Sequence, residues 1–206
     1  MFSGLIAQVA KVKSFKNNVL TLESNLYPKL GDSIAINGAC LTAIESSKTH
    51  FSVELSQKTQ KSVALENYKD LVHIEPALQA NARLDGHFVQ GHVDAIGVIE
   101  RIQRNVNQVD FFIKASKETL MLCIPQGSIT IDGVSLTLTS VEKEGFWLTI
   151  IPYTFENSLF KTYQVKRRVN IETDLLVRSI ASLLKRQNEL KNTHSWAELD
   201  ALTLGF

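Results

Sequence analysis

The sequence predicts an all-β protein of two similar halves, each a small antiparallel barrel or sandwich, followed by one helix. A repeat is the first reason, because SIAINGACLT at residues 33–42 returns as SITIDGVSLT at residues 128–137, an offset of 95 residues. The second reason is that both halves consist of short segments rich in β-branched residues, separated by turn residues. The third is that only the segment beginning at Asp174 has a long helical period.

The repeat extends over most of both halves. Further pairs at the same offset are Phe51 with Phe146 and Thr59 with Thr154, and after two inserted residues the segment 72–75 aligns with 169–172. The beginnings of the halves, residues 2–6 and 89–93, align at an offset of 87. We therefore predict an N-terminal domain of residues 1–87, a second domain of residues 88–173, and a C-terminal helix with a tail over residues 174–206.

Strands and tight turns are predicted at equivalent places in the two halves. Segments 33–36, 42–44 and 51–55 have the composition of half-buried strands. The dipeptides Asn37-Gly38 and Asp132-Gly133 favour two-residue hairpin turns, in which glycine adopts a positive φ at low cost.

The helix is predicted over residues 174–190. Its spacing of four, three, four and three residues is typical of a coiled-coil seam, which consists of Leu176, Ile180, Leu183, Gln187 and Leu190. Such a seam favours a partner helix, and the alternative is a helix packed on its own barrel. Residues 194–206 have no clear period, and we expect a docked or frayed tail.

Composition limits the classes of partner. The 206 residues include 22 Lys and Arg against 21 Asp and Glu, a formal charge of +1, so no strong field for nucleic acid or an anionic membrane is expected. The longest apolar runs fall short of the roughly 20 residues of a membrane helix, and the N-terminus lacks the basic region of a signal peptide. We expect a cytoplasmic protein with neither nucleic acid nor membrane as a partner.

Cys40 and Ser135 occupy the same position of the repeat, two residues after a turn glycine and before Leu-Thr. A thiol and a hydroxyl at equivalent positions indicate two related pockets with different tasks, and the alternative is neutral divergence at a strand start. Thr42 and Thr137, two residues further on, share that face of the strand and could hydrogen-bond a heterocycle.

The segment RLDGHFVQGHVD at residues 83–94 lies where the halves join. Its histidines, His87 and His92, are five residues apart, which matches no common zinc spacing, so no metal is expected. Two cysteines, Cys40 and Cys123, are too few for a disulfide framework. His92 stands where the first half has Leu5, and its titration range suits proton transfer. The alternative is a hydrogen-bonded histidine between the domains.

Six motifs in order resemble the riboflavin synthase α-chain family over residues 1 to about 190. They are MFSGLI at 1–6, NGACLT at 37–42, GHFVQGHVD at 86–94, IDGVSLT at 131–137, IP at 151–152 and VNIE at 169–172. Each motif is weak by itself, but their order is specific.

The resemblance implies two tandem six-stranded Greek-key barrels per chain and a homotrimer built around the C-terminal helices. It implies the last step of riboflavin biosynthesis, in which one 6,7-dimethyl-8-ribityllumazine gives a four-carbon unit to another, forming riboflavin and 5-amino-6-ribitylaminouracil. No metal or cofactor is implied, and lumazine synthase is implied as a partner. The active site is expected between the N-terminal barrel of one subunit and the C-terminal barrel of its neighbour.

The resemblance also implies the site residues. In the N-terminal pocket they are Phe2, Gly4, Leu5, Ile6, Ser33, Cys40, Leu41, Thr42, Glu54, Leu55, Ser56, Gln57, Lys58 and Thr59. In the C-terminal pocket they are Gly91, His92, Val93, Gln126, Ser135, Leu136, Thr137, Ile150, Ile151, Pro152, Tyr153, Thr154 and Phe155. We expect His92 and Ser135 to position or relay a proton, Cys40 to act at the opposing ring, and Asp174 to act at the subunit boundary.

Four positions depart from the family pattern. Gln126 replaces a common lysine, Tyr153 a His or Glu, Lys58 a Glu, and His73 an Asn. Two other classes of function remain open at this point. One is a non-catalytic lumazine or flavin carrier of the same fold, and the other is a structural tandem-barrel adaptor.

Overall fold

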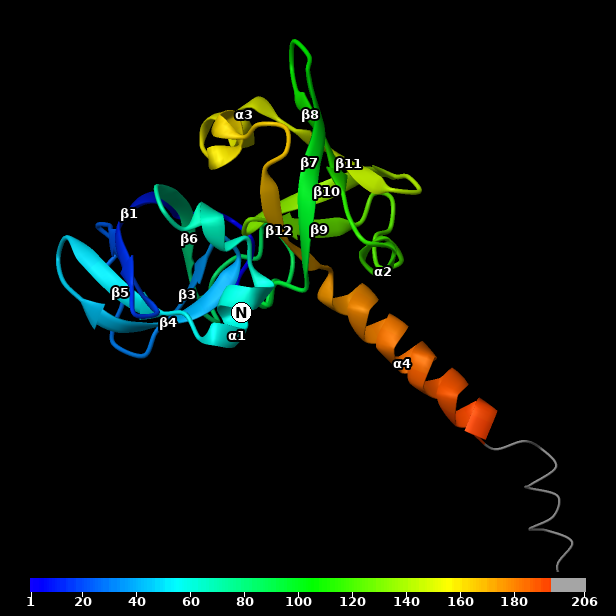
Figure 1. Cartoon of the computed structure of the whole chain (residues 1–206), viewed down its shortest axis with the longest axis horizontal. Coiled ribbons are helices and arrows are strands. Elements are labelled where there is room, and N and C mark those ends of the chain that lie inside the picture. Colours follow the sequence, from blue (N-terminus) through cyan, green and yellow to red (C-terminus); the bar gives the residue numbers. More distant parts are fainter. Residues whose placement is uncertain (194–206) are drawn as a thin grey trace, which may run out of the picture. The chain divides into compact units, whose positions relative to one another are not determined.

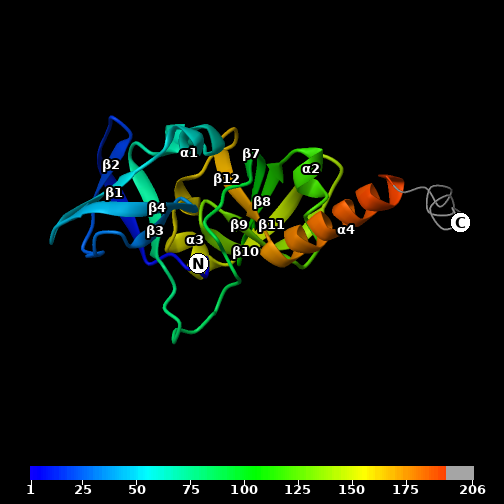
Figure 2. The same ribbon diagram turned by 90° about the horizontal axis from the view of Figure 1, so that it is seen from below.

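The computed structural model describes residues 1–193, and its strands form two closed six-stranded antiparallel barrels. Figure 1 and Figure 2 show the barrels side by side, the first in blue to cyan and the second in green to yellow with β12 in gold to orange. The strands of the N-terminal barrel are β1 (Gln8–Lys16), β2 (Val19–Glu23), β3 (Ser33–Ile36), β4 (Ala39–Ser46), β5 (His50–Glu54) and β6 (Leu71–Pro76). Those of the C-terminal barrel are β7 (Ala95–Arg104), β8 (Val109–Lys114), β9 (Ser128–Ile131), β10 (Val134–Val141), β11 (Gly145–Ile150) and β12 (Arg168–Thr173).

The two barrels have the same topology. The first runs β1-β2-β5-β4-β3-β6, and the second has the equivalent cyclic order. Strands β3, β4 and β5 are consecutive neighbours, and β2 lies beside β5, which is the Greek-key arrangement. The prediction of tandem Greek-key barrels is therefore confirmed. Short helices connect some strands: α1 (Gln57–Ser62) and η1 (Leu65–Asn67) lie between β5 and β6, and α3 (Pro152–Glu156) and η2 (Leu159–Thr162) lie between the equivalent β11 and β12. Helix α2 (Lys117–Leu120) lies between β8 and β9, whose equivalents β2 and β3 are joined without a helix.

Alternation along the hairpin strands separates core from surface. Ile34, Ile36 and Leu41 point into the N-terminal barrel, where they belong to its main hydrophobic cluster. Ala35 and Cys40 face outward and pack instead against a small separate cluster that includes Phe2. The outer face of this hairpin is therefore covered by chain from elsewhere in the sequence.

The two hairpin turns meet where the barrels touch. Gly38 and Gly133 have φ of +82° and +84°, and a Cβ added to either would lie 2.8 Å from the other's backbone nitrogen. The expected positive φ is confirmed, and the close approach is a second reason for glycine that the sequence does not reveal.

A buried polar cluster joins the barrels around these turns. His73 Nδ1 lies 2.9 Å from the Asp132 carbonyl, and the Leu159 N–H donates to His73 Nε2 at 2.8 Å. At the equivalent position, Asn170 Nδ2 donates to the Asn37 carbonyl at 2.8 Å and Asn170 Oδ1 accepts from the Ala64 N–H at 2.7 Å. A neutral histidine with its proton on Nδ1 thus makes the same two hydrogen bonds as an asparagine amide.

Because His73 must be neutral to make the two hydrogen bonds that an asparagine makes at any pH, we predict that His73 makes the fold sensitive to acid. Burial lowers the pKa of His73 to about 4 from its ordinary value of 6.5, because the charged imidazolium would lose its hydration there. The contribution of neutral His73 to the free energy of unfolding is complete above the pKa of the unfolded state. About 3 kcal/mol of this free energy is lost as the pH falls toward about 4. We expect His73→Asn to remove this loss, measured as the free energy of urea unfolding against pH.

The difference between the pH profiles of wild type and His73→Asn separates the effect of His73 from that of the other charged groups around it. Burial raises the pKa of Asp132 to about 6, and that carboxylate acts in the opposite direction, stabilising the fold as it is protonated. Arg167 nearby also opposes protonation of His73. His50→Gln, on β5, is the control. Parallel pH profiles for wild type and His73→Asn would contradict this account.

The described C-terminal part of the chain, residues 175–193, belongs to a unit separate from the barrels. Its helix α4 runs from Leu175 to Thr193, which confirms the helix expected over 174–190. Leu176, Ile180, Leu183 and Leu184 are more than half exposed on it. The expectation of a docked or frayed tail at 194–206 lies outside the described residues.

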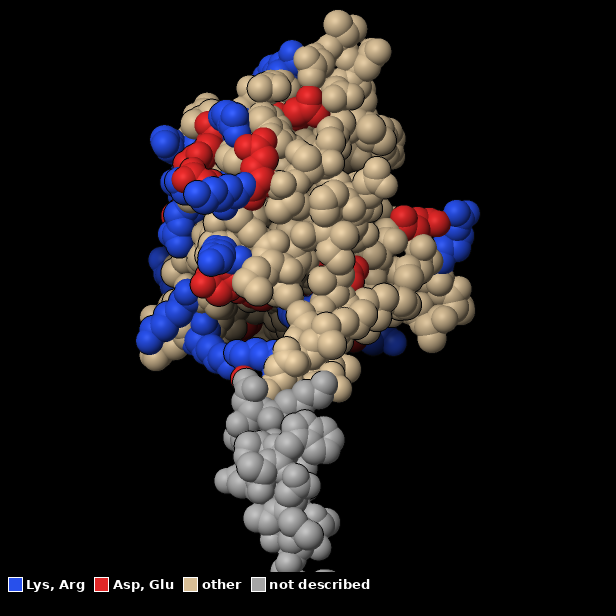
Figure 3. Space-filling model, turned by 90° about the vertical axis from the view of Figure 1, so that its right-hand side faces the viewer, with Lys and Arg blue, Asp and Glu red and all other residues tan. Residues whose placement is uncertain are grey.

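The connection between the barrels, residues 77–94, is a long loop in Figure 2, and the expected domain boundary at residue 88 falls within it. Acidic and basic side chains both occur on the face shown in Figure 3, with a broad uncharged area beside them. Among the described residues, no helix is long and apolar enough to cross a membrane.

Candidate active site

Two segments that precede the barrels define the site: the N-terminal segment (residues 2–6) and the linker segment (residues 89–93). They pair with each other, since the Phe2 N–H donates to the Val89 carbonyl at 2.7 Å and the Val89 N–H donates back at 3.1 Å. Each is also held by a carboxylate of its own half. Glu75 accepts hydrogen bonds from the backbone of Ser3 and Gly4, and Glu172 accepts from residues 90–92.

Beyond these anchors, each segment packs on the other barrel. The Ser135 N–H donates to the Gly4 carbonyl at 2.8 Å, and the Cys40 N–H donates to the Gly91 carbonyl at 2.8 Å. A Cβ at Gly4 would lie 2.6 Å from the Ser135 Cβ, and one at Gly91 equally close to the Cys40 Cβ. The backbone therefore reaches these two side chains only through glycine.

The two segments are thus exchanged, because the N-terminal segment packs on the C-terminal barrel and the linker segment packs on the N-terminal barrel. This exchange corrects the expected grouping of the site residues. The sequence placed Gly4, Leu5 and Ile6 with Cys40, and Gly91, His92 and Val93 with Ser135; the structure pairs them the other way. The repeat identifies which residues are equivalent, but not on which copy each segment packs. Within one chain, His92 lines the cavity beside Cys40, so a proton relay between His92 and Ser135 of the same chain stays a prediction.

A cavity of about 430 Å³ lies beside Cys40, large enough for a heterocyclic ligand. It brings together six of the predicted residues, namely Cys40, Lys58, Thr59, Gly91, His92 and Val93. Ala39, Ser62 and Val63 also line it and were not predicted. The side chains come from β4, α1 and the linker segment, so the cavity is a product of the exchange.

On the C-terminal barrel, the Ser135 hydroxyl lies 2.7 Å from Nδ1 of His87. The Thr130 hydroxyl lies 3.3 Å from Nε2 of the same ring. Burial lowers the pKa of His87, while the nearby Asp174 carboxylate raises it. With its proton on Nε2, the neutral ring leaves Nδ1 to accept the Ser135 proton, which makes the pair a candidate general base.

Sequence reasoning missed His87 as a catalytic candidate, because it considered this residue only as a metal ligand. One signal was present: His87 lies before the aligned part of the second half, so it has no counterpart in the first. Asp174, predicted as a catalytic residue, acts electrostatically on His87.

The remaining predicted residues fall into three groups. Four side chains lie in the barrel cores, where only their backbone could reach a ligand on the outer face: Leu41, Leu55, Leu136 and Ile150. Phe2, the first residue of the N-terminal segment, is buried in a cluster with Ala35 and Val89. The side chains that are exposed or partly exposed are Leu5, Ile6, Thr42, Glu54, Ser56, Gln57, Gln126, Thr137, Ile151, Pro152, Tyr153, Thr154 and Phe155.

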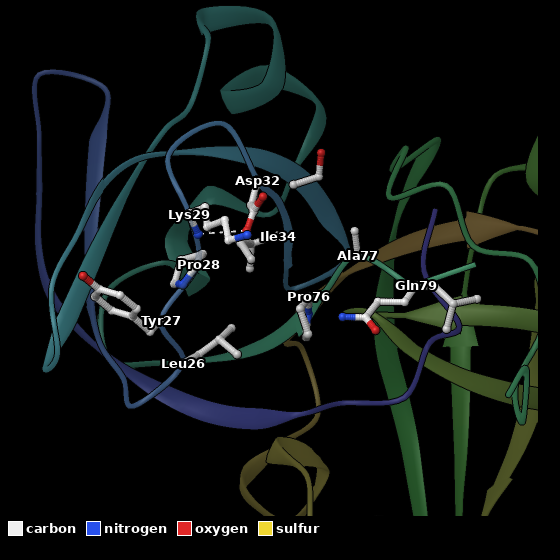
Figure 4. Close-up of a pocket in the computed structure, with 11 residues that line it drawn as sticks. Leu26, Tyr27, Pro28, Lys29, Asp32, Ile34, Pro76, Ala77 and Gln79 are labelled. Carbon is white, nitrogen blue, oxygen red and sulfur yellow. Dashed lines mark hydrogen bonds between the residues drawn. The ribbon is translucent and has the colours of Figure 1, made fainter. Parts of the chain in front are cut away.

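A second cavity, of about 450 Å³, lies between the β2–β3 loop and the chain that follows β6. Figure 4 shows it with Leu26, Tyr27 and Pro76 around it and with the Lys29 N–H donating to the Asp32 carboxylate at 2.8 Å. Ser33 is the one predicted site residue that lines it. Among residues 1–193, no group of three or more potential ligands is arranged to hold a metal ion.

Comparisons with known proteins identify the repeated domain and the family. The lumazine binding domain family model matches residues 3–77 and 90–174. The riboflavin synthase of Bacillus amyloliquefaciens is 33% identical over 207 residues, 96% of each chain. That of Bacillus subtilis (strain 168) is 34% identical over 93% of each chain. That of Schizosaccharomyces pombe is 32% identical over 84% of this chain and 89% of the other.

Solved structures share the fold. LumP complexed with riboflavin superposes with a TM-score of 0.75 at 16% identity, over 84% of this chain and 99% of that one. Two barrels of this type, each with an equivalent outer surface beside Cys40 or Ser135, define a protein with two lumazine binding domains. The chain belongs to the riboflavin synthase family, and it is an enzyme, a transferase.

Proposed function

We propose that this chain converts two molecules of 6,7-dimethyl-8-ribityllumazine into riboflavin and 5-amino-6-(D-ribitylamino)uracil, the last step of riboflavin biosynthesis. The repeat supports this proposal, because two copies of one ligand are best held by two copies of one fold. The observation that carries it is the 2.7 Å contact between His87 and Ser135, which places a base at one of the two related surfaces. The relatives named riboflavin synthase support the same reaction.

Proton abstraction is the step that the His87–Ser135 pair supplies. A methyl group at C7 of the lumazine is acidic because its carbanion delocalises into the electron-poor pteridine. Ser135 accepts the methyl proton while its own proton passes to Nδ1 of His87, whose depressed pKa keeps the ring neutral beforehand. All atoms of the two substrates appear in the two products, so the reaction requires neither an oxidant nor a reductant.

The second lumazine binds in the cavity beside Cys40. Thr59 and Ser62 offer hydroxyl groups there, and the backbone of Gly91 approaches the Cys40 side chain closely. Holding two rings in contact lowers the barrier chiefly by proximity and orientation.

A complete site needs two chains in this proposal. Leu5, Ile151 and Tyr153 around the C-terminal surface are 47%, 58% and 76% exposed, which suits a surface that another chain covers. The exposed apolar residues of α4 support a homotrimer held by that helix. A cytoplasmic location and an association with lumazine synthase belong to the same proposal.

One assay tests the function. Purified protein is mixed with 6,7-dimethyl-8-ribityllumazine, and the absorbance of riboflavin is followed; we expect one riboflavin for every two lumazines consumed. A lumazine carrier is the second candidate, favoured by the shared fold with LumP. Ligand bound with a fluorescence change but without any riboflavin would favour the carrier and contradict the enzyme.

A further inference from the structure

Three of the differences between the two lumazine surfaces of this chain concern titratable side chains. Cys40 corresponds to Ser135, and His92 corresponds to Leu5. Lys58 on α1 corresponds to Tyr153 on α3, at the same offset of 95 residues. The N-terminal surface therefore has an ammonium group where the C-terminal surface has a neutral phenol.

Lys58 is the strongest positive charge of the cavity beside Cys40. The other titratable side chains that line this cavity are Cys40 and His92, and no Asp or Glu is among the described residues that do so. Because Lys58 is exposed, its ammonium can stay hydrated until a ligand arrives. A ligand that becomes negatively charged in this cavity therefore meets the Lys58 ammonium, and no carboxylate among the described lining residues neutralises that ammonium.

The base lies on the other surface. The His87–Ser135 pair abstracts a proton from the methyl group of the ring on the C-terminal barrel. The resulting carbanion forms a carbon–carbon bond to a ring carbon of the lumazine beside Cys40. The π bond of that ring's C=N group breaks, and its electron pair moves onto the ring nitrogen and toward the carbonyl oxygens.

We propose that Lys58 binds this developing anion, so that the N-terminal cavity holds the electrophilic ring and the C-terminal surface holds the nucleophilic ring. The inference rests on the proposed function and assigns the two pockets their roles. Charge develops in the transition state more than in the bound substrate, so Lys58 should act on kcat more than on KM.

Turnover of Lys58 variants tests this role. We expect Lys58→Gln to lower kcat about tenfold, less than the 10²–10³-fold of a buried donor because an exposed ammonium is partly hydrated. Lys58→Glu should lower it further, and Lys58→Arg should restore it to within about threefold. Lys61→Gln, on the same helix but not lining the cavity, is the matched control.

Two outcomes of this assay would overturn the proposal. One is a wild-type kcat in Lys58→Gln, and the other is a rise in KM alone, which would make Lys58 a ground-state contact. An equal loss in Lys61→Gln would also overturn it, since the effect would then belong to the helix rather than to the cavity.

A measurement of ligand affinity gives a second test of Lys58 that does not depend on turnover. Unsubstituted pteridine-2,4-dione loses a ring proton in mild alkali, so its affinity can be measured for the neutral and the anionic form. Wild type and Lys61→Gln should prefer the anion, and Lys58→Gln should lose that preference. No preference in wild type would overturn the role of Lys58, whereas preference without riboflavin formation would support it and contradict only the proposed function.

Discussion

Replacing His87 by Gln is expected to lower kcat by about 10²–10⁴-fold, the usual cost of losing a positioned base. Glutamine can still hydrogen-bond Ser135, so the surface should keep its shape and the protein its melting temperature. Ser135→Ala should cause a similar loss because the hydroxyl is the group that meets the substrate. Steady-state formation of riboflavin measures both.

The double variant is the sharper measurement. If His87 and Ser135 act as one unit, the double variant should lose no more activity than either single variant. Ser140→Ala, on the same strand β10 but outside the site, is the control. In wild type, kcat/KM should fall in acid as His87 is protonated, and this part of the profile should disappear in His87→Gln. Wild-type rates in both single variants would refute the assignment of the base.

The substitution Ile180→Asp is expected to abolish turnover by separating the subunits. Ile180 is 58% exposed on α4 and belongs to the four-three spaced seam. An aspartate there would bury several like charges at a helix interface, which costs several kcal/mol without a partner. The chain should become a monomer in analytical ultracentrifugation and lose at least about 100-fold in turnover, since proximity of the two rings supplies much of the rate.

A folded monomer should still bind lumazine beside Cys40, because that cavity is built within residues 39–93 of one chain. Ser182→Asp, on α4 outside the seam, should leave both the assembly and the activity unchanged. An active Ile180→Asp monomer would disprove a site shared between chains, and a wild-type protein that sediments as a monomer would disprove the trimer.

The fold was predictable where its determinants are local. The turns Asn37-Gly38 and Asp132-Gly133 fix two hairpins, and the strands around them alternate with period two. The helix α4 followed from its spacing; in the structure it begins one residue later, at Leu175, and ends at Thr193 instead of residue 190. Equivalence of Cys40 and Ser135 also followed from the sequence alone, because a repeat preserves position along the chain.

The composition of each pocket was not predictable in the same way. The segment before each barrel is anchored by its own Glu75 or Glu172, and yet its glycine lies against the other barrel's Ser135 or Cys40. Nothing local distinguishes this exchange from the unexchanged arrangement, since the same residues are present in both. The partnership of His87 with Ser135 spans 48 residues and depends on the same exchange.

The amino-acid sequence by itself determined that this protein is a duplicated barrel with two versions of one ligand surface and a C-terminal helix. Hydrophobic period and turn chemistry are short-range properties, so they can be read along one strand or one hairpin. Tertiary structure alone decided which segment completes which surface, which histidine meets Ser135, and which groups His73 contacts between the barrels. Those choices depend on close approach between residues far apart in the chain, where backbone contact at Gly4 and Gly91 and burial at His73 set the outcome.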